Sequence, residues 1–262
     1  PRRAPAHLSK PACGSGNRLF IFAGGNGPGI PEKSSSRHNS PRCRPFRDGG
    51  QAFPMFSLQT IFGSGKQFYT YLDEAAQAAA DSAKALHAMM READREPALD
   101  AFKLARLRER AASDKISQAL VDSFMTPIER EDIEALGSAL YKIPKQIEKF
   151  ADRYALATQH LAHIDFAPRA AMLEQAAGVV VDMVKDLRHM NIDRMTAMNE
   201  KLRALENEAD RLMLELYREI YSGRLDNLQM FLLKEFFEIL EKAIDRCREA
   251  GVVVYQIVLK NS

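Results

Sequence analysis

MTAMNEKLRALENEADRLMLEL, residues 195–216, is the stretch that decides the fold. Its apolar residues recur at intervals of three and four, at Met195, Met198, Leu202, Leu205, Ala209, Leu212 and Leu216. These intervals place the apolar side chains on one face of an α-helix, which has about 3.6 residues per turn. The stretch therefore predicts an amphipathic helix that buries one stripe against other helices.

The same helical period continues through the chain from Met55 onward, without the Asn-Gly or Asp-Gly signals of β-hairpins. Proline, glycine and capping residues divide it into six expected helices, which span about residues 67–93, 97–124, 126–163, 165–189, 195–222 and 228–259. Long helices joined by short links are typical of antiparallel bundles. The sequence thus predicts an all-α fold.

Two prolines lie at or within the third of these helices. Thr126 is expected to cap its first turn, with Pro127 in that turn and Glu129 completing a capping box. Pro144 removes a backbone donor and is expected to interrupt and kink the helix.

A weak internal repeat suggests how the six helices are grouped. Ser113-Asp114-Lys115 resembles Ala209-Asp210-Arg211, and residues 140–145 (LYKIPK) align with residues 240–245 (LEKAID). We therefore expect two three-helix bundles, formed by about residues 55–164 and 165–262.

The first 54 residues differ from the rest in composition. They contain eight of the 14 glycines, eight of the 12 prolines, and nine Lys and Arg against two Asp and Glu. Because they have no apolar period, we expect residues 1–54 to be a disordered basic tail. Met55 is expected to be the natural start of the protein; the alternative is a disordered basic arm that belongs to it.

From residue 55 onward the balance is acidic, with 28 Lys and Arg against 33 Asp and Glu. Nucleic acid is not an expected partner, because phosphate binding requires a concentrated positive field.

No stretch from residue 55 onward reaches the roughly 20 apolar residues that span a bilayer. Cys247 is the single cysteine of this part, which suits a reducing compartment. We expect a soluble cytoplasmic protein, at most peripheral to the inner membrane.

Several short patterns carry little chemistry. Gly63-Ser64-Gly65-Lys66 lacks the spacing and preceding strand of a phosphate loop and is expected to be a flexible link. The glycines of residues 24–29 lack the context of a dinucleotide site. His160 and His163 are expected to lie in the last turn of a helix, where partial positive charge suits the helix dipole, rather than to bind a metal. Cys247 is expected to be a small buried residue.

Carboxylates in the second half are the strongest chemical signal. Glu206 and Asp210 are four residues apart beside the apolar stripe, with Glu208 next to them, and Glu238, Glu241 and Asp245 share a face of the last helix. If these helices pack together, their carboxylates meet in one groove and offer oxygen ligands for a hard cation. The alternative is a solvated charged face, with Arg203, Arg211, Lys242 and Arg246 as ion-pair partners.

Three segments resemble a known family. Residues 124–133 (FMTPIEREDI) resemble the F-x-T-P-x-x-R-E-D-I signature of the PhoU-like phosphate transport regulators. Residues 205–211 (LENEADR) resemble their L-E-x-E-A-D-R segment, and residues 240–247 (LEKAIDRC) resemble their E-x-x-x-D segment. The resemblance extends over essentially all of residues 55–262.

The resemblance implies a regulator of inorganic phosphate transport, without enzymatic activity, that binds metal through acidic motifs. Its expected partner is a Pit-type phosphate transporter or a phosphate-signalling protein, and a homo-oligomer is possible. Carried onto this sequence, the metal ligands are Glu206, Asp210, Glu241 and Asp245, with Glu208 and Glu238 nearby. The metal is a divalent or trivalent ion: iron, manganese, magnesium or zinc.

The first half departs from the family pattern. Tyr141 and Lys145 occupy the positions where the family has an acidic pair. Arg110 occupies the position that is equivalent to Glu206 in the internal repeat. Asp114 remains, and it is expected to form a salt bridge with these basic residues. A metal is therefore expected only in the second half.

Two other functions stay open from the sequence. One is a metal-dependent helical-bundle enzyme, which would favour Glu-x-x-His pairs, although no Glu stands three residues before His87, His160, His163 or His189. The other is a helical adaptor that binds no metal.

Overall fold

The computed structural model describes residues 58–92, 98–161 and 163–262, and for residues 58–64 only the backbone. The expected tail, with the glycines of residues 24–29, and Pro97, where the second helix is expected to begin, lie outside the described residues. The described part is all helical: α1 Leu58–Arg91, α2 Asp100–Asp122, α3 Arg130–Leu161, α4 Ala167–Asp186, the 3₁₀ turn η1 Leu187–His189, α5 Ile192–Ile220 and α6 Asn227–Asn261. The predicted all-α fold of six helices is confirmed.

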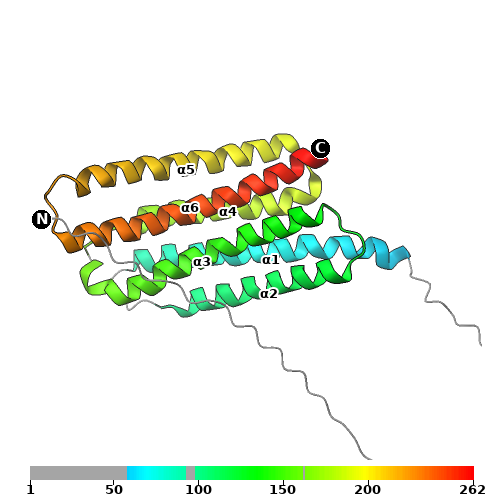
Figure 1. The fold of residues 1–262 in the computed structure, drawn as a ribbon, viewed down its shortest axis with the longest axis horizontal. Coiled ribbons are helices and arrows are strands. Elements are labelled where there is room, and N and C mark those ends of the chain that lie inside the picture. Colours follow the sequence, from blue (N-terminus) through cyan, green and yellow to red (C-terminus); the bar gives the residue numbers. More distant parts are fainter. Residues whose placement is uncertain (1–57, 93–97, 162) are drawn as a thin grey trace, which may run out of the picture. The chain divides into compact units, whose positions relative to one another are not determined.

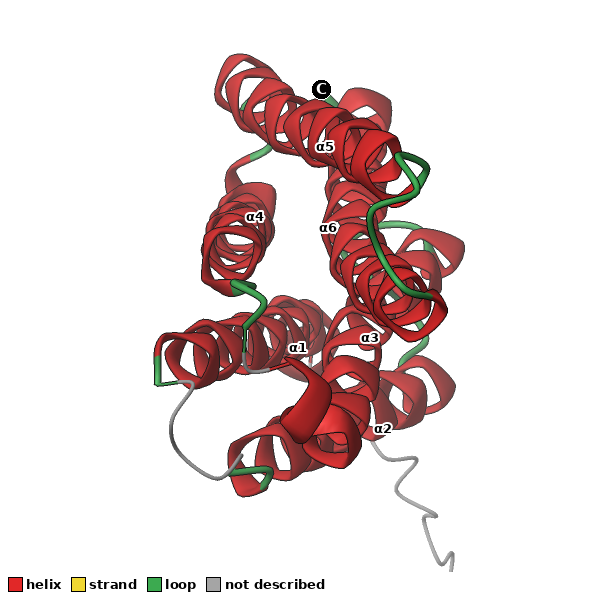
Figure 2. Ribbon diagram, turned by 90° about the vertical axis from the view of Figure 1, so that its left-hand side faces the viewer, coloured by secondary structure: helices red, strands yellow, loops and turns green. Residues whose placement is uncertain are grey.

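The helices form two three-helix bundles that lie side by side. Helices α1, α2 and α3 pack on one another, and so do α4, α5 and α6. The bundles meet where α3 lies along α6 and where α1 lies along α4, as Figures 1 and 2 show. Helix α6 therefore has α3 on one flank and α5 on the other.

An aromatic cluster joins the two bundles. Phe150 and Tyr154 of α3 meet Phe236 and Phe237 of α6 around Phe166, the residue before α4. Phe166 is buried, and the centres of its ring and that of Phe150 are 5.4 Å apart in an edge-to-face arrangement. This geometry is the one that aromatic quadrupoles favour.

Side-chain caps fix the start of the last two helices. Asn191 Oδ1 accepts a hydrogen bond from Arg194 N at 2.9 Å at the start of α5. Asp226 and Gln229 form a reciprocal capping box at the start of α6. Each cap satisfies backbone donors that the first helical turn leaves without partners.

The start of α3 differs from the prediction. The helix begins at Arg130, so Thr126 lies outside it and does not cap it. Arg130 instead donates hydrogen bonds to the carbonyl oxygens of Leu120 and Ser123 at the end of α2. One guanidinium thus satisfies the terminal carbonyls of the preceding helix, which delays the start of α3.

Two further expectations are corrected. Residues 63–66 lie inside α1, not in a flexible link, and Gly65 faces Pro127 of the α2–α3 loop. Helix α3 runs through Pro144 without interruption. In both places tertiary packing outweighs the local cost of glycine or proline. Among the described residues no helix is long and apolar enough to cross a membrane.

Candidate functional site: an acidic groove along α6

A groove of 640 Å³ lies along α6, between α3 and α5, and it contains three of the predicted site residues. We call it the acidic groove. Its lining side chains are Asp210, Glu235, Glu238 and Glu241, the basic Lys149 and Lys242, and the uncharged Gln146, Met213, Leu214, Tyr217 and Ile239. Its lining contains four carboxylates and two ammonium groups.

Glu241 lies among these carboxylates. Burial raises the pKa of its carboxyl, and the neighbouring carboxylates of Asp245, Asp210 and Glu238 raise it further, against the opposing effect of Lys242. Among the described residues no ion pair involves Glu241 or Asp210. A cation entering the groove would therefore relieve repulsion among these carboxylates.

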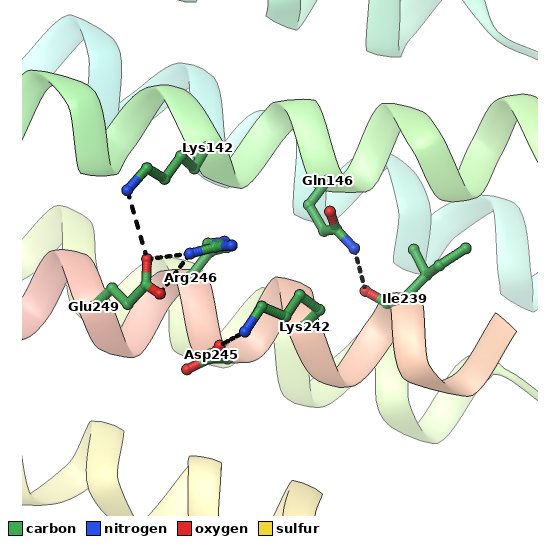
Figure 3. A network of polar contacts seen from close by, with 7 residues as sticks. All are labelled: Lys142, Gln146, Ile239, Lys242, Asp245, Arg246 and Glu249. Atoms are coloured by element: carbon green, nitrogen blue, oxygen red, sulfur yellow. Dashed lines mark hydrogen bonds and ion pairs between the residues drawn. The ribbon is translucent and has the colours of Figure 1, made fainter. Parts of the chain in front are cut away.

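Glu238 and Asp245 have partners on their own helix or on α5. Tyr217 donates a hydrogen bond of 2.5 Å to Glu238, and Lys234 pairs with the same carboxylate at 2.9 Å. Burial alone would raise the pKa of Glu238, but these two hydrogen bonds lower it overall. Lys242 pairs with Asp245, which Figure 3 shows on the side of α6 turned away from α3.

The α3 side of the groove is held to α6 by polar contacts. Gln146 Nε2 donates to the carbonyl oxygen of Ile239 at 3.3 Å, and Lys142 lies 3.9 Å from Glu249. Figure 3 shows both side chains reaching from α3 to α6. Arg153 also pairs with Glu235. These contacts fix the wall that α3 contributes.

Glu206 and Glu208 are not brought into the groove. Arg248 donates to Glu206 at 3.2 Å and to Asn199 at 2.8 Å, so it joins α6 to α5. Glu208 pairs with Arg211 on the exposed face of α5, and that hydrogen bond lowers the pKa of Glu208. The arginines therefore neutralise both carboxylates.

Of the predicted ligands, only those around Glu241 come near one another. Its carboxylate neighbours supply oxygen, the ligand that magnesium, manganese and iron(II) accept. Within the described ranges, however, no three Asp, Glu, His or Cys side chains are arranged to hold a metal ion. Glu206 and Glu208 do not fit such a site, because their carboxylates already bind guanidinium groups.

The first bundle has an arginine at its centre instead. Arg106 is buried and donates to Glu109 at 3.0 Å and to Glu148 at 3.1 Å, and its guanidinium lies 4.5 Å from the centre of the Tyr141 ring. Lys145 lies over the same ring at 5.5 Å. In this cluster, which we call the arginine cluster, Glu109 and Glu148 have a guanidinium partner, unlike Asp210 and Glu241 of the acidic groove.

The expected salt bridges of Asp114 are not formed. Asp114 is exposed, and no ion pair of the described residues joins it to Arg110 or Lys145. The basic residue that does form ion pairs in this bundle is Arg106, because it lies on the side of α2 that faces α3. Asp114 faces solvent.

The sequence did not single out Arg106, Glu109, Glu148 or Arg248. Two of their ion pairs join residues 42 positions apart, Arg106 to Glu148 and Glu206 to Arg248. The repeat offered a signal that could have found them, because Glu148 and Arg248 occupy equivalent positions with opposite charge.

The remaining candidates behave as simple structural residues. Cys247 is fully buried, and burial raises the pKa of its thiol, so the predicted apolar role is confirmed. His160 contacts the side chain of its neighbour Gln159 at 3.1 Å on the exposed surface near the end of α3.

Comparison with known proteins gives matches in sequence and in structure, although no family model matches the chain. A stretch of 142 residues, 53% of this chain, is 24% identical to the UPF0111 protein YkaA of Bacillus subtilis and covers 68% of that protein.

Two crystal structures from Shewanella oneidensis MR-1 match the fold. One is of a PhoU-like phosphate regulatory protein and the other of a PhoU-like protein, with TM-scores of 0.63 and 0.64. Each is 18% identical in sequence, and each match covers 74% of this chain and 99% of the other chain. The predicted resemblance is confirmed at the level of the fold: this chain has the paired three-helix bundles of PhoU-like proteins.

Proposed function

We propose that this protein is a regulator or accessory protein of inorganic phosphate transport, and that it acts by binding a partner rather than by catalysing a reaction. The observation that carries this proposal is the match over 74% of the chain to a structure described as a PhoU-like phosphate regulatory protein. The motifs at residues 124–133, 205–211 and 240–247 support the same conclusion.

The partner we propose is the cytoplasmic side of a Pit-type phosphate transporter, or a phosphate-signalling protein. Deletion of the gene should then change the rate of radiolabelled phosphate uptake, or the phosphate concentration at which uptake is repressed. Re-expression of the chain should restore the original response. Unchanged uptake at every phosphate concentration would contradict the phosphate role.

We also propose a cation site in the second bundle, with Glu241 at its centre and Asp210, Asp245 and Glu238 as the other acidic side chains. The raised pKa of Glu241, caused first by burial and then by these carboxylates, supports it. A bound metal would neutralise the groove and fix the relative positions of α5 and α6.

Metal analysis of the purified protein tests this part. The double substitution Glu241→Gln and Asp245→Asn should remove nearly all bound metal, whereas Asp114→Asn, the control in the first bundle, should leave the metal content unchanged. Equal loss from both variants would contradict a site confined to the second bundle. Protein that binds no metal at all would leave the metal-free adaptor as the function.

A further inference from the structure

Large apolar side chains are exposed along the acidic groove. Leu214, which lines the groove, is 61% exposed and therefore contributes little to the core. Tyr221 is 76% exposed and stacks on the groove residue Tyr217, with ring centres 5.9 Å apart. The groove therefore has an apolar rim on the α5 side.

The α6 side continues the same surface. Phe231 is 61% exposed and stands four and seven residues before Glu235 and Glu238, so the three share one helix face. From Phe231 to Lys242 the helix rises by about 17 Å, or about three turns. The part of α6 that lines the groove is thus long enough to receive a short helix. Figure 1 shows α3 and α5 on either side of α6.

The charge of the groove indicates which helix would fit. Asp210 and Glu241 have no ion-pair partner among the residues described, and Glu241 is the more buried of the two. The other two lining carboxylates already have cationic partners, since Glu235 pairs with Arg153 and Glu238 with Lys234, so the free negative charge of the groove lies on Asp210 and Glu241. An anionic lipid surface or an acidic segment would be repelled, whereas lysine or arginine side chains would gain charge-assisted hydrogen bonds.

We propose that the acidic groove binds a basic amphipathic helix of the protein's partner, with its apolar face against Leu214, Tyr221 and Phe231 and its lysines or arginines on Asp210 and Glu241. The inserted helix would complete a four-helix arrangement with α3, α5 and α6. Amphipathic helices bind apolar grooves in this manner through residues spaced by three and four. The inference rests on the proposed function in one respect, namely that the protein acts through a binding partner.

Synthetic peptides test the groove directly. The probe is a fluorescent peptide of about 18 residues, long enough to form a helix, with leucine at helical spacing and lysine elsewhere. One control peptide has glutamate in place of lysine, and a second has the probe's composition in an order that breaks the helical period. Fluorescence anisotropy with the full chain should show binding of the first peptide alone.

Matched variants locate the site. Leu214→Ser, which removes the apolar contact without adding charge, and the double variant Asp210→Asn with Glu241→Gln should each weaken binding by about tenfold or more. Leu107→Ser is the control, because Leu107 is 62% exposed on α2, away from the groove. If serine at 214 disturbs folding, judged by circular dichroism, Leu214→Ala replaces it.

Each outcome decides the inference. Binding should persist in a metal chelator and weaken when Mn²⁺ is added, since the metal and the lysines use the same carboxylates. Equal binding of the lysine and glutamate peptides, equal loss from Leu107→Ser and Leu214→Ser, or no binding of the lysine peptide would overturn the inference. Peptide binding with unchanged phosphate uptake in the deletion strain would contradict the phosphate role and leave the groove inference standing.

Discussion

Arg106 is a buried cation that ties α2 to α3. Its side chain is 4% exposed, and it binds Glu109, Glu148 and the carbonyl oxygen of Tyr141, the last at 3.5 Å. Above the Glu109 pKa of about 7, removing Arg106 leaves the fully buried Glu109 carboxylate without its cation, at a cost of about 3–5 kcal/mol, whereas Glu148 is 27% exposed and can be solvated. We expect Arg106→Ala to lower the free energy of unfolding by that amount, as measured by urea denaturation.

A surface pair on α5 provides the control for this prediction. Arg203 and Glu200 pair at 2.5 Å, but their side chains are 58% and 50% exposed. Exposed pairs contribute little, because water and salt screen them. Arg203→Ala should therefore leave the urea midpoint almost unchanged. A similar midpoint shift in both variants would show that the arginine cluster is not specially stabilising.

Glu109 makes the stability of the first bundle depend on pH. Its carboxyl is fully buried with Oε1 unpartnered, and burial raises the pKa of Glu109 from 4.5 to about 7, against the opposing effects of Arg106 and Arg110. The folded state therefore holds a proton that the unfolded chain has already released. The stability from this group is complete below pH 4.5 and is lost as the pH rises through about 7.

The substitution Glu109→Gln should remove this dependence. Relative to the variant, the unmodified protein is expected to lose stability between pH 4.5 and about 7, as measured by the free energy of unfolding at several pH values. Glu131→Gln, on the exposed side of α3, is the control and should give a constant difference. A constant difference for Glu109→Gln would contradict the prediction.

At the scale of elements, two glycines inside helices are expected to respond oppositely to alanine. A Cβ atom at Gly251 of α6 would lie 2.2 Å from Leu202 Cδ1 and 3.4 Å from Met183 Sδ, whereas one at Gly178 of α4 would meet no heavy atom within 4 Å. Gly251→Ala forces the buried Leu202 to move and should cost about 1–3 kcal/mol. Gly178→Ala should stabilise the protein by about 1 kcal/mol through helix propensity.

Thermal unfolding of the two single variants checks this pair. The melting temperature should fall for Gly251→Ala and rise for Gly178→Ala. If both variants were stabilised, Leu202 would have room to turn aside, and the close approach of α5, α6 and α4 at Gly251 would not limit packing. The contrast thus measures how tightly the second bundle is packed.

The elements also show what the sequence could predict. The apolar period of residues 195–216 predicts α5 correctly, because burial of one stripe determines where a helix lies. The ends of helices are harder: Thr126 has the chemistry of a cap, yet Arg130 binds the end of α2 and α3 starts later. Asp226 is a cap that the sequence analysis did not name, although its capping partner Gln229 is only three residues away.

The candidate site was predictable in part for the same reason. Spacing alone places Glu238 and Glu241 on one face of α6 and Asp210 on a face of α5. Whether a carboxylate meets a lysine, an arginine or another carboxylate depends on the rotation of each helix about its axis. This is why Glu206 and Glu208, which look equivalent to Asp210 in the sequence, bind arginines instead.

At the scale of the whole molecule, the buried core extends through both bundles, and Phe166 joins them. Its ring meets Phe150 and Tyr154 of α3 at 5.4 and 6.1 Å between centres, and Phe237 of α6 at 4.9 Å. Because one core connects all six helices, we expect the bundles to unfold as a single cooperative unit. Phe166→Ala should lower the free energy of unfolding by about 3–5 kcal/mol.

Hydrogen exchange tests whether this loss is shared. Helices α2 and α5 lie at opposite sides of the molecule, as Figure 2 shows, and neither contains a residue of the aromatic cluster. If the unit is cooperative, the slowest amides of α2 and α5 exchange through the same global opening, so Phe166→Ala should reduce protection of both by the same factor. Loss confined to α4, α5 and α6 would mean that the bundles open separately, in which case a partner bound along α6 could stabilise the second bundle without affecting the first.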